Sequence, residues 1–121
     1  MVFVEPPKRE GNEIILSITG FISICPRTGN EDKANIEIRY VPGEIQIDRY
    51  TLKKYLDLFR DKEIYMEVTP INILDFCVNY CLTHAQESSK SMMEAVPKRI
   101  TIKTTYYKPK RMNIEINFNR E

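Results

Sequence analysis

The sequence predicts an α+β fold in which four strands form one antiparallel sheet and two helices cover one of its faces, in the order ββααββ. Two observations predict this fold. Alternating apolar residues mark strands near both ends of the 121-residue chain, and the apolar period lengthens to that of a helix in the middle. A chain of this length can bury a core of its own, so we expect a single domain over residues 1–121.

The first two strands are expected to follow a polar leader, residues 1–11. Glu13–Ile24 is rich in isoleucine and predicts a long strand, with Gly20 as a bulge or a point of close approach. Residues 34–41 alternate apolar and charged side chains, which predicts a half-buried strand. Residues 26–33 are expected to form the loop between these two strands.

Two helices are predicted in the middle of the chain. From Thr51 the apolar residues recur at i, i+3, i+4 and i+7, which indicates a short amphipathic helix. A second helix is expected to begin at Thr69 as its cap, with Pro70 at the first helical position, and to end between residues 90 and 96. Its expected apolar stripe consists of Ile71, Leu74, Val78, Cys81, Leu82 and Ala85.

The last part of the chain is locally basic. Residues 99–107 and 113–118 alternate apolar and polar side chains and predict a closing hairpin. The net charge of +1 hides a cluster of basic residues here. Basic side chains next to tyrosines can follow a phosphate backbone and stack on bases, but charges that protect a sheet edge explain the same pattern. The candidate nucleic-acid contacts are Lys103, Lys108, Lys110 and Arg111.

Composition indicates a folded protein outside the secretory route. Hydrophobic residues make up 42% and charged residues 29% of the chain, which excludes general disorder. No apolar run approaches the roughly 18 residues that cross a bilayer, and the N-terminus lacks the pattern of a signal peptide. Three cysteines, an odd number, argue against a disulfide framework. We therefore expect a cytoplasmic protein with reduced thiols and no membrane partner.

The segment after the first strand carries the strongest candidate for chemistry. Cys25 stands where Pro26 ends the strand, and a turn through Gly29 leads to Asp32 seven residues later. A thiolate at a strand end with a carboxylate nearby fits a nucleophile and its general acid or base. Arg27 is the nearest positive charge and would favour the thiolate if it faced the sulfur. A buried, inert cysteine is the alternative that the residues alone leave open.

A second cluster, Cys77, Cys81 and His84, lies at i, i+4 and i+7 of the second helix. This spacing places all three on one face, which raises the question of a metal site. Structural zinc usually needs four ligands, and the chain offers no fourth ligand of similar softness. Apolar residues share the face, so we interpret the two cysteines as core residues and expect no metal.

The middle of the chain resembles the 7-cyano-7-deazaguanine reductases, the nitrile reductases of queuosine biosynthesis. The resemblance implies the tunnelling fold, whose subunits join their sheets into rings. It also implies that Cys25 attacks the nitrile carbon to give a thioimide, that Asp32 handles the protons and that Glu67 holds the base. The residues that carry the resemblance are CPxTG at 25–29, Asp32, IRYVP at 38–42, LKxYLxxFR at 52–60 and Glu67.

Two departures separate the chain from the bacterial reductases. Residues 48–51 read DRYT where the reductases carry the nicotinamide-binding signature ESKS, so Tyr50 replaces the signature lysine. Met66 replaces a histidine that is expected to assist hydride transfer, whereas Glu67 remains. This combination resembles the short archaeal amidinotransferases that make archaeosine by adding ammonia to the nitrile of a deazaguanine in the D-loop of tRNA.

The resemblance therefore implies an amidinotransferase that uses no cofactor and whose partners are ammonia and tRNA carrying 7-cyano-7-deazaguanine. It further implies a ring-shaped homo-oligomer, a pentamer or decamer, with the site between subunits, so that Glu67 can act on the cysteine of a neighbour. Two alternatives stay open. One is an NADPH-dependent nitrile reductase acting on the free base, and the other is a non-catalytic tRNA-binding ring in which Cys25 is inert.

Overall fold

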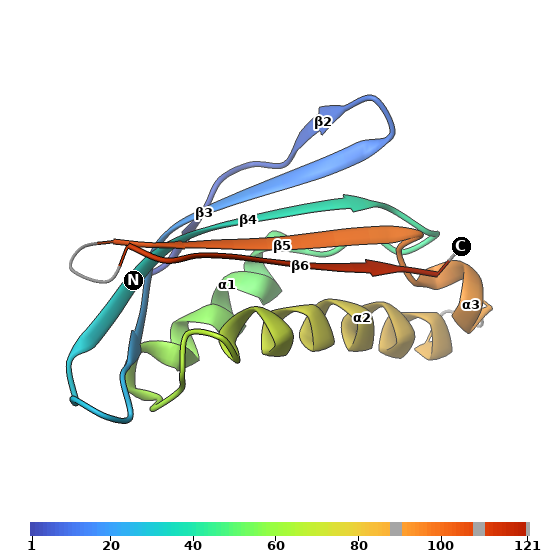
Figure 1. Cartoon of the computed structure of the whole chain (residues 1–121). Helices are drawn as coiled ribbons and strands as arrows, with labels where there is room; N and C mark the ends of the chain where they lie inside the picture. The colour runs from blue at the N-terminus through green and yellow to red at the C-terminus, as the bar shows by residue number, and fades with distance from the viewer. Residues whose placement is uncertain (88–90, 108–110, 121) are drawn as a thin grey trace.

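The computed structural model describes residues 1–87, 91–107 and 111–120, and these form one sheet with helices on one of its faces (Figure 1). The strands are β1 Phe3–Val4, β2 Lys8–Glu10, β3 Glu13–Ile24, β4 Glu31–Val41, β5 Arg99–Tyr106 and β6 Asn113–Asn119. Within the described residues the sheet has the order β1-β3-β4-β5-β6, and β2 also pairs with β3. All of these pairs are antiparallel.

The α+β class is confirmed, but the described sheet contains six strands rather than four. The additional strands β1 and β2 lie in residues 1–11, which were expected to be a polar leader. Val4 pairs with Ile18 of β3, and the side chains of Val2 and Val4 are buried. Strands of two and three residues are too short to show an apolar period, so their pairing is not visible in the sequence.

The helices agree with the prediction in place but not in every boundary. They are α1 Arg49–Asp57, the 3-10 helix Leu58–Asp61, α2 Thr69–Glu87 and α3 Met92–Ala95. The helix α1 begins before the predicted Thr51, because the Asp48 carboxylate caps it by accepting a hydrogen bond from the Thr51 N–H (2.9 Å). The helix α2 begins within one residue of the predicted place, but Thr69 is its first residue and not its cap, and the Thr69 hydroxyl donates to the carbonyl of Tyr65 (3.4 Å). Its end was expected between residues 90 and 96, but α2 is described only to Glu87, residues 88–90 lie outside the described residues, and residues 92–95 form the separate helix α3.

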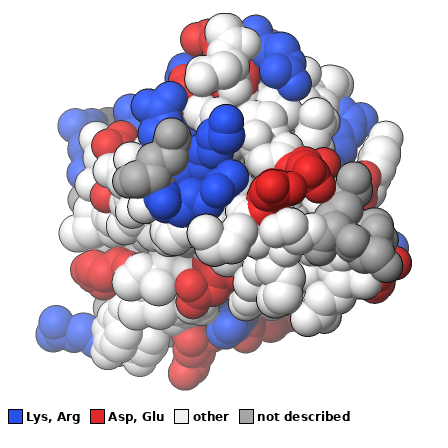
Figure 2. Space-filling model, turned by 90° about the vertical axis from the view of Figure 1, so that its right-hand side faces the viewer, with Lys and Arg blue, Asp and Glu red and all other residues white. Residues whose placement is uncertain are grey.

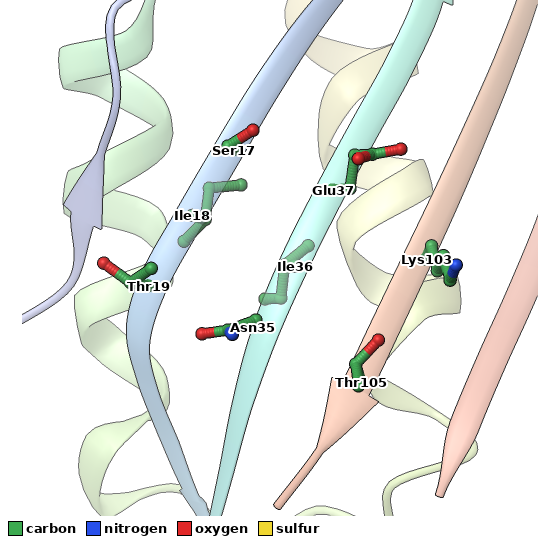
Figure 3. A pocket seen from close by; sticks show the side chains of 8 residues that line it. All are labelled: Ser17, Ile18, Thr19, Asn35, Ile36, Glu37, Lys103 and Thr105. Carbon is green, nitrogen blue, oxygen red and sulfur yellow. The ribbon is translucent and has the colours of Figure 1, made fainter.

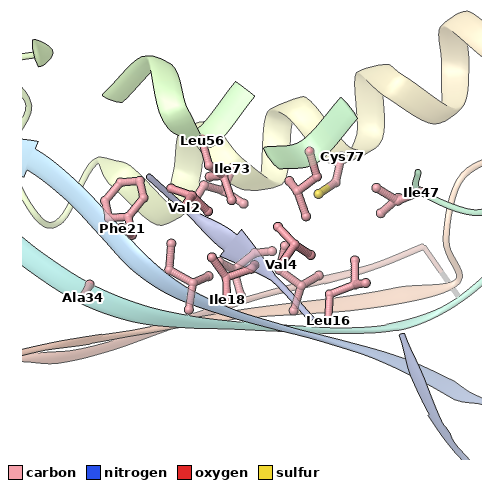
Figure 4. Packing of buried hydrophobic residues seen from close by; sticks show 14 of the residues in the cluster. Val2, Val4, Leu16, Ile18, Phe21, Ala34, Ile47, Leu56, Ile73 and Cys77 are labelled. Carbon is pink, nitrogen blue, oxygen red and sulfur yellow. The ribbon is translucent and has the colours of Figure 1, made fainter. Parts of the chain in front are cut away.

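The buried face of α2 differs from the predicted stripe. Ile73, Cys77, Cys81 and Ala85 follow one another at intervals of four and are fully buried, whereas Ile71 is 48% exposed. Apolar residues occur on several sides of this helix, so the sequence did not single out the side that packs. Figure 4 shows side chains of α2, among them Ile73 and Cys77, pointing toward the apolar side chains of the sheet.

Strand β3 changes register at Gly20, where the pairing with β4 shifts between Ile18 and Phe21. Gly20 has a φ of +76°, and an added Cβ would lie 2.7 Å from the carbonyl oxygen of Met1. Only glycine adopts this conformation without strain and leaves room for the N-terminal backbone. The predicted bulge and close approach are both confirmed. Beyond the bulge, Phe21 and Ser23 are buried, so the end of β3 turns these side chains toward the helices.

Charged side chains of both signs lie together on the surface. The Arg39 guanidinium on β4 contacts carboxylates of Glu37 (2.7 Å), Glu10 (3.4 Å) and Glu13 (3.6 Å). The face in Figure 2 likewise shows a group of lysine and arginine side chains next to a group of acidic ones.

In the part of the chain that the structure describes, no helix combines the length and apolar composition needed to cross a bilayer.

Candidate active site

A pocket of about 300 Å³ lies at the end of the β3–β4 hairpin. The three residues that the sequence singled out for catalysis and base binding, Cys25, Asp32 and Glu67, all line it. The tertiary structure therefore brings the whole predicted set together within a single chain. The remaining lining residues are Arg27, Tyr65 and Met66.

Cys25 directly follows the last residue of β3 and is 6% exposed. Its N–H donates to the carbonyl of Asn30 (2.9 Å), and its carbonyl accepts from the N–H of Gly29 (2.9 Å). Gly29 has a φ of +71°, which lets the chain reverse here without strain. Two backbone hydrogen bonds thus fix the position of Cys25, while Arg27 in the same turn is exposed.

Asp32 lies on β4 and not in the loop where it was expected. Strand β4 begins at Glu31, so the loop is shorter than the predicted residues 26–33. The first residues of β4 are charged and lack an apolar alternation, which is why the sequence placed the strand start too late. Asp32 is 5% exposed and lies directly opposite Ser23 in the register. Asp32 thus brings a buried carboxyl group to the pocket that Cys25 also lines.

A short parallel bridge between Ile24 and Glu63 brings Glu67 to the pocket. The N–H of Ile24 donates to the carbonyl of Lys62 (2.9 Å), and the N–H of Ile64 donates to the carbonyl of Ile24 (3.0 Å). The segment before α2 is thereby fixed to the end of β3. Glu67 follows three residues after Ile64 and is exposed, in contrast to the two buried residues from the hairpin.

Tyr65 and Met66 complete the wall next to Glu67. Met66 is buried, so a thioether lines the pocket at the position where the resemblance implies a histidine. Tyr65 is 48% exposed. Tyr65 was not predicted from the sequence, where an aromatic residue close to Glu67, in a segment without a helical or strand period, was its only signal.

Residues 48–51 build the start of α1 and are not among the residues that line the pocket. Hydrogen bonds from the backbone and hydroxyl of Thr51 hold the pKa of Asp48 below its ordinary value. Tyr50 is exposed, and the guanidinium of Arg49 lies 4.9 Å from the centre of its ring. The segment that departs from the reductase signature therefore has a local capping role.

The interpretation of Cys77 and Cys81 as core residues is confirmed, because both are fully buried. Burial raises the pKa of Cys81 to about 11 and also raises the pKa of Cys77. His84 contacts the carbonyl of Tyr80 through Nδ1 (2.9 Å), and the two rings lie 4.1 Å apart. Among the residues that the structure describes, no three potential metal ligands cluster.

Of the candidate nucleic-acid contacts, Lys103 and Arg111 can be placed. Lys103 is exposed on β5 and lines a hollow of about 230 Å³ on the sheet face opposite the helices (Figure 3). It lies opposite Glu37 in the register, so an acidic group shares this surface. Arg111 is exposed. Lys108 and Lys110 lie outside the described residues, and nucleic-acid binding stays a prediction.

The curated proteins that match the chain in sequence include NADPH-dependent 7-cyano-7-deazaguanine reductases. The chain is 41% identical over 70 residues to the NADPH-dependent 7-cyano-7-deazaguanine reductase of Thermomicrobium roseum. The aligned segment covers 57% of this chain and 55% of that protein. The chain is 37% identical over 73 residues to the reductase of the same name from Anaeromyxobacter dehalogenans. This aligned segment covers 60% of this chain and 60% of that protein. The match thus spans less than two thirds of these relatives' length. No family model matches the chain.

The fold is similar to that of the crystal structure of the archaeosine synthase QueF-Like in the apo form. The TM-score is 0.63, the similarity covers 91% of this chain and 94% of that chain, and the identity is 19%. This similarity confirms the predicted tunnelling fold. The chain is therefore similar in sequence to the 7-cyano-7-deazaguanine reductases, as the residues around Cys25 indicated, and similar in fold to the QueF-Like protein.

Proposed function

We propose that this relative of the nitrile reductases is an enzyme of 7-deazaguanine nitrile chemistry, and that it acts as an amidinotransferase. The observation that carries the proposal is the pocket that Cys25, Asp32 and Glu67 line together. A nitrile is a weak electrophile, so its capture needs a strong nucleophile and a proton for the developing nitrogen anion. The first two residues supply these groups, and the third supplies a carboxylate that can hold the base.

The first half of the proposed reaction forms a covalent intermediate. The Cys25 thiolate attacks the nitrile carbon, and a carbon–sulfur bond forms. The electron pair of one carbon–nitrogen π bond moves to the nitrogen, which takes a proton from the carboxyl group of Asp32. The product is a thioimide, and Asp32 is left as a carboxylate. The burial of both side chains supports this step, because charges interact more strongly where water is excluded.

In the second half, ammonia releases the product. Ammonia adds to the thioimide carbon, the carbon–sulfur bond breaks, and the thiolate of Cys25 leaves with the bonding electron pair. The added nitrogen gives one proton to the Asp32 carboxylate. The product is a neutral amidine, and both side chains return to their starting states. The nitrile carbon keeps its oxidation state, so this reaction consumes no reductant.

Glu67 is the proposed recognition residue for the base. Its carboxylate is exposed at the edge of the pocket, where two oxygens can accept hydrogen bonds from the exocyclic amine and a ring N–H of the guanine-like face. Held there, the base would direct its nitrile toward Cys25. Recognition of this face does not depend on what is bound to the other end of the base, so it suits a base within a nucleic acid.

The presence of Met66 in the pocket favours discharge of the thioimide by ammonia over its reduction by hydride. A thioether neither donates nor accepts a proton at neutral pH, and it lines the pocket at the position of the histidine that the resemblance implies for the reductases. Tyr50 likewise stands where the resemblance implies the signature lysine. We accordingly propose tRNA carrying 7-cyano-7-deazaguanine and ammonia as substrates, and a ring-shaped homo-oligomer as the assembly.

Reduction of the free base is the second candidate. It is favoured by the sequence relatives, which are named as NADPH-dependent 7-cyano-7-deazaguanine reductases. Both candidates share the thioimide and differ only in what discharges it. An experiment that first accumulates the adduct and then offers either nucleophile therefore separates them.

The test measures the intact mass of the protein after incubation with 7-cyano-7-deazaguanine. We expect an adduct of one base per chain in the wild type and in Cys81→Ser, a matched variant that removes a different buried thiol, and none in Cys25→Ala. Ammonium should discharge the adduct as the amidine, and NADPH should leave it unchanged. Discharge by NADPH would identify a reductase. The absence of any adduct would contradict both enzymatic candidates and favour a non-catalytic protein.

A further inference from the structure

Ser23 on β3 carries a buried hydroxyl that has no role in the reaction proposed above. The residue is fully buried, and within the described part of the chain its Oγ has no hydrogen-bond partner. Buried polar groups are almost always hydrogen-bonded, and each exception calls for an explanation. A hydroxyl at this place is explained if its partner takes up the right position only when the pocket is occupied.

The geometry of the hairpin identifies that partner. Ser23 lies directly opposite Asp32 in the register, where side chains on the same face have Cβ atoms about 4.5–5.5 Å apart. Both side chains are buried, so they share the face that the helices cover. Cys25 is two residues further along the chain, which is about 6.6 Å at the usual rise of a strand. Asp32 is therefore the nearer of the two reacting residues.

We propose that Ser23 is a positioning residue that holds the carboxyl group of Asp32 toward the nitrile nitrogen, an inference that rests on the proposed function. A hydroxyl donates to a carboxylate and accepts from a carboxylic acid. Asp32 passes through both states in each cycle of the proposed reaction, and an acceptor-only or donor-only neighbour would satisfy just one of them. Catalytic hydrogen bonds often tighten only when substrate is bound, which accounts for the unpartnered Oγ.

The experiment compares two reactions of Cys25 in the same protein. Addition of 7-cyano-7-deazaguanine needs a proton from Asp32, whereas alkylation of Cys25 by iodoacetamide does not. Rates are measured by mass spectrometry for the wild type, Ser23→Ala, Ser23→Thr and Thr104→Val. Thr104 is the matched control, because it is a fully buried hydroxyl on the same sheet, on β5, and does not line the pocket.

The decisive quantity is the ratio of the nitrile rate to the iodoacetamide rate, measured under conditions in which the buried Cys77 and Cys81 stay unalkylated, so that both rates report folded protein. Since positioned proton transfer contributes about 100-fold or more, we expect Ser23→Ala to lower this ratio about 10- to 100-fold. Ser23→Thr retains the hydroxyl and should return the ratio to within about threefold of wild type, and Thr104→Val should leave it unchanged.

Two results would overturn the inference while leaving the proposed function intact: a wild-type ratio in Ser23→Ala, or a ratio in Ser23→Thr as low as in Ser23→Ala. An equal slowing of both reactions in Ser23→Ala gives a wild-type ratio and would mean that the hydroxyl acts on the thiol or the fold rather than on Asp32. If the wild type forms no adduct at all, the proposed function fails, and the inference about Ser23 fails with it.

Discussion

Replacement of Glu67 by glutamine tests the recognition of the base separately from the chemistry. The side chain is exposed, so Glu67→Gln should change the free energy of unfolding by less than about 0.5 kcal/mol. A hydrogen bond to a charged group contributes about 1.5–3 kcal/mol, which corresponds to a factor of roughly 10 to 150. We therefore expect the concentration of 7-cyano-7-deazaguanine at half-maximal adduct rate to rise by that factor. The limiting rate should stay within about threefold of wild type, because Cys25 and Asp32 are retained.

Glu63→Gln is the matched control for this variant. Glu63 is an exposed glutamate of the same connecting segment, four residues earlier, and it does not line the pocket. Its substitution should leave both the half-maximal concentration and the limiting rate unchanged. Identical saturation curves for Glu67→Gln and Glu63→Gln would refute the assignment of Glu67 to base recognition. A large fall in the limiting rate of Glu67→Gln alone would instead place Glu67 in the chemical step.

Three further predictions concern the framework. Tyr40→Phe removes the hydroxyl that accepts a hydrogen bond from the buried N–H of Ile47 (3.1 Å), so urea unfolding should report a loss of about 1–3 kcal/mol. Burial raises the pKa of Tyr40 to about 12 from 10.0, so wild-type stability should fall as the pH rises from 10 to 12, and less so in Tyr40→Phe. Asp48→Ala should cost about 0.5–2 kcal/mol in thermal unfolding at neutral pH. Because hydrogen bonds from Thr51 lower the pKa of Asp48, this difference should vanish as the pH falls below the ordinary value of 3.8. Gly20→Ala should destabilise the fold by about 1–3 kcal/mol or more, since its Cβ would meet backbone at a positive φ. An unchanged unfolding midpoint in any of these variants would contradict the contact assigned to that residue.

The elements that the sequence predicted correctly are those with a repeated local signal. Strand β3 was predicted with its observed bounds, and Gly20 marked its bulge. The start of α2 was predicted from a threonine cap followed by Pro70. The buried face of α2 was only partly predicted, because apolar residues such as Ile71 lie outside the packed face. The side that packs depends on where the helix meets the sheet, which no single segment specifies.

The hairpin half of the candidate site was visible in the sequence, because Cys25 and Asp32 are joined by one turn. Their burial and the opposition of Asp32 to Ser23 were not visible, since charged residues at the start of β4 gave no strand signal. Glu67 was selected through resemblance alone. Its place beside the cysteine depends on the bridge between Ile24 and Glu63, which joins segments far apart in the chain.

The sequence by itself determined the α+β class, the order of the main strands and helices, and the turn that carries Cys25 toward Asp32. Each of these follows from a local pattern of apolar spacing, capping or turn residues, which acts over a few neighbouring positions. Only the tertiary structure decided that residues 1–11 add two strands to the sheet and that Glu67 lines the same pocket as Cys25. Distant segments pair where a strand edge still has unpaired backbone groups and an apolar surface is still uncovered. Both depend on how the other elements have packed, and no local pattern specifies that.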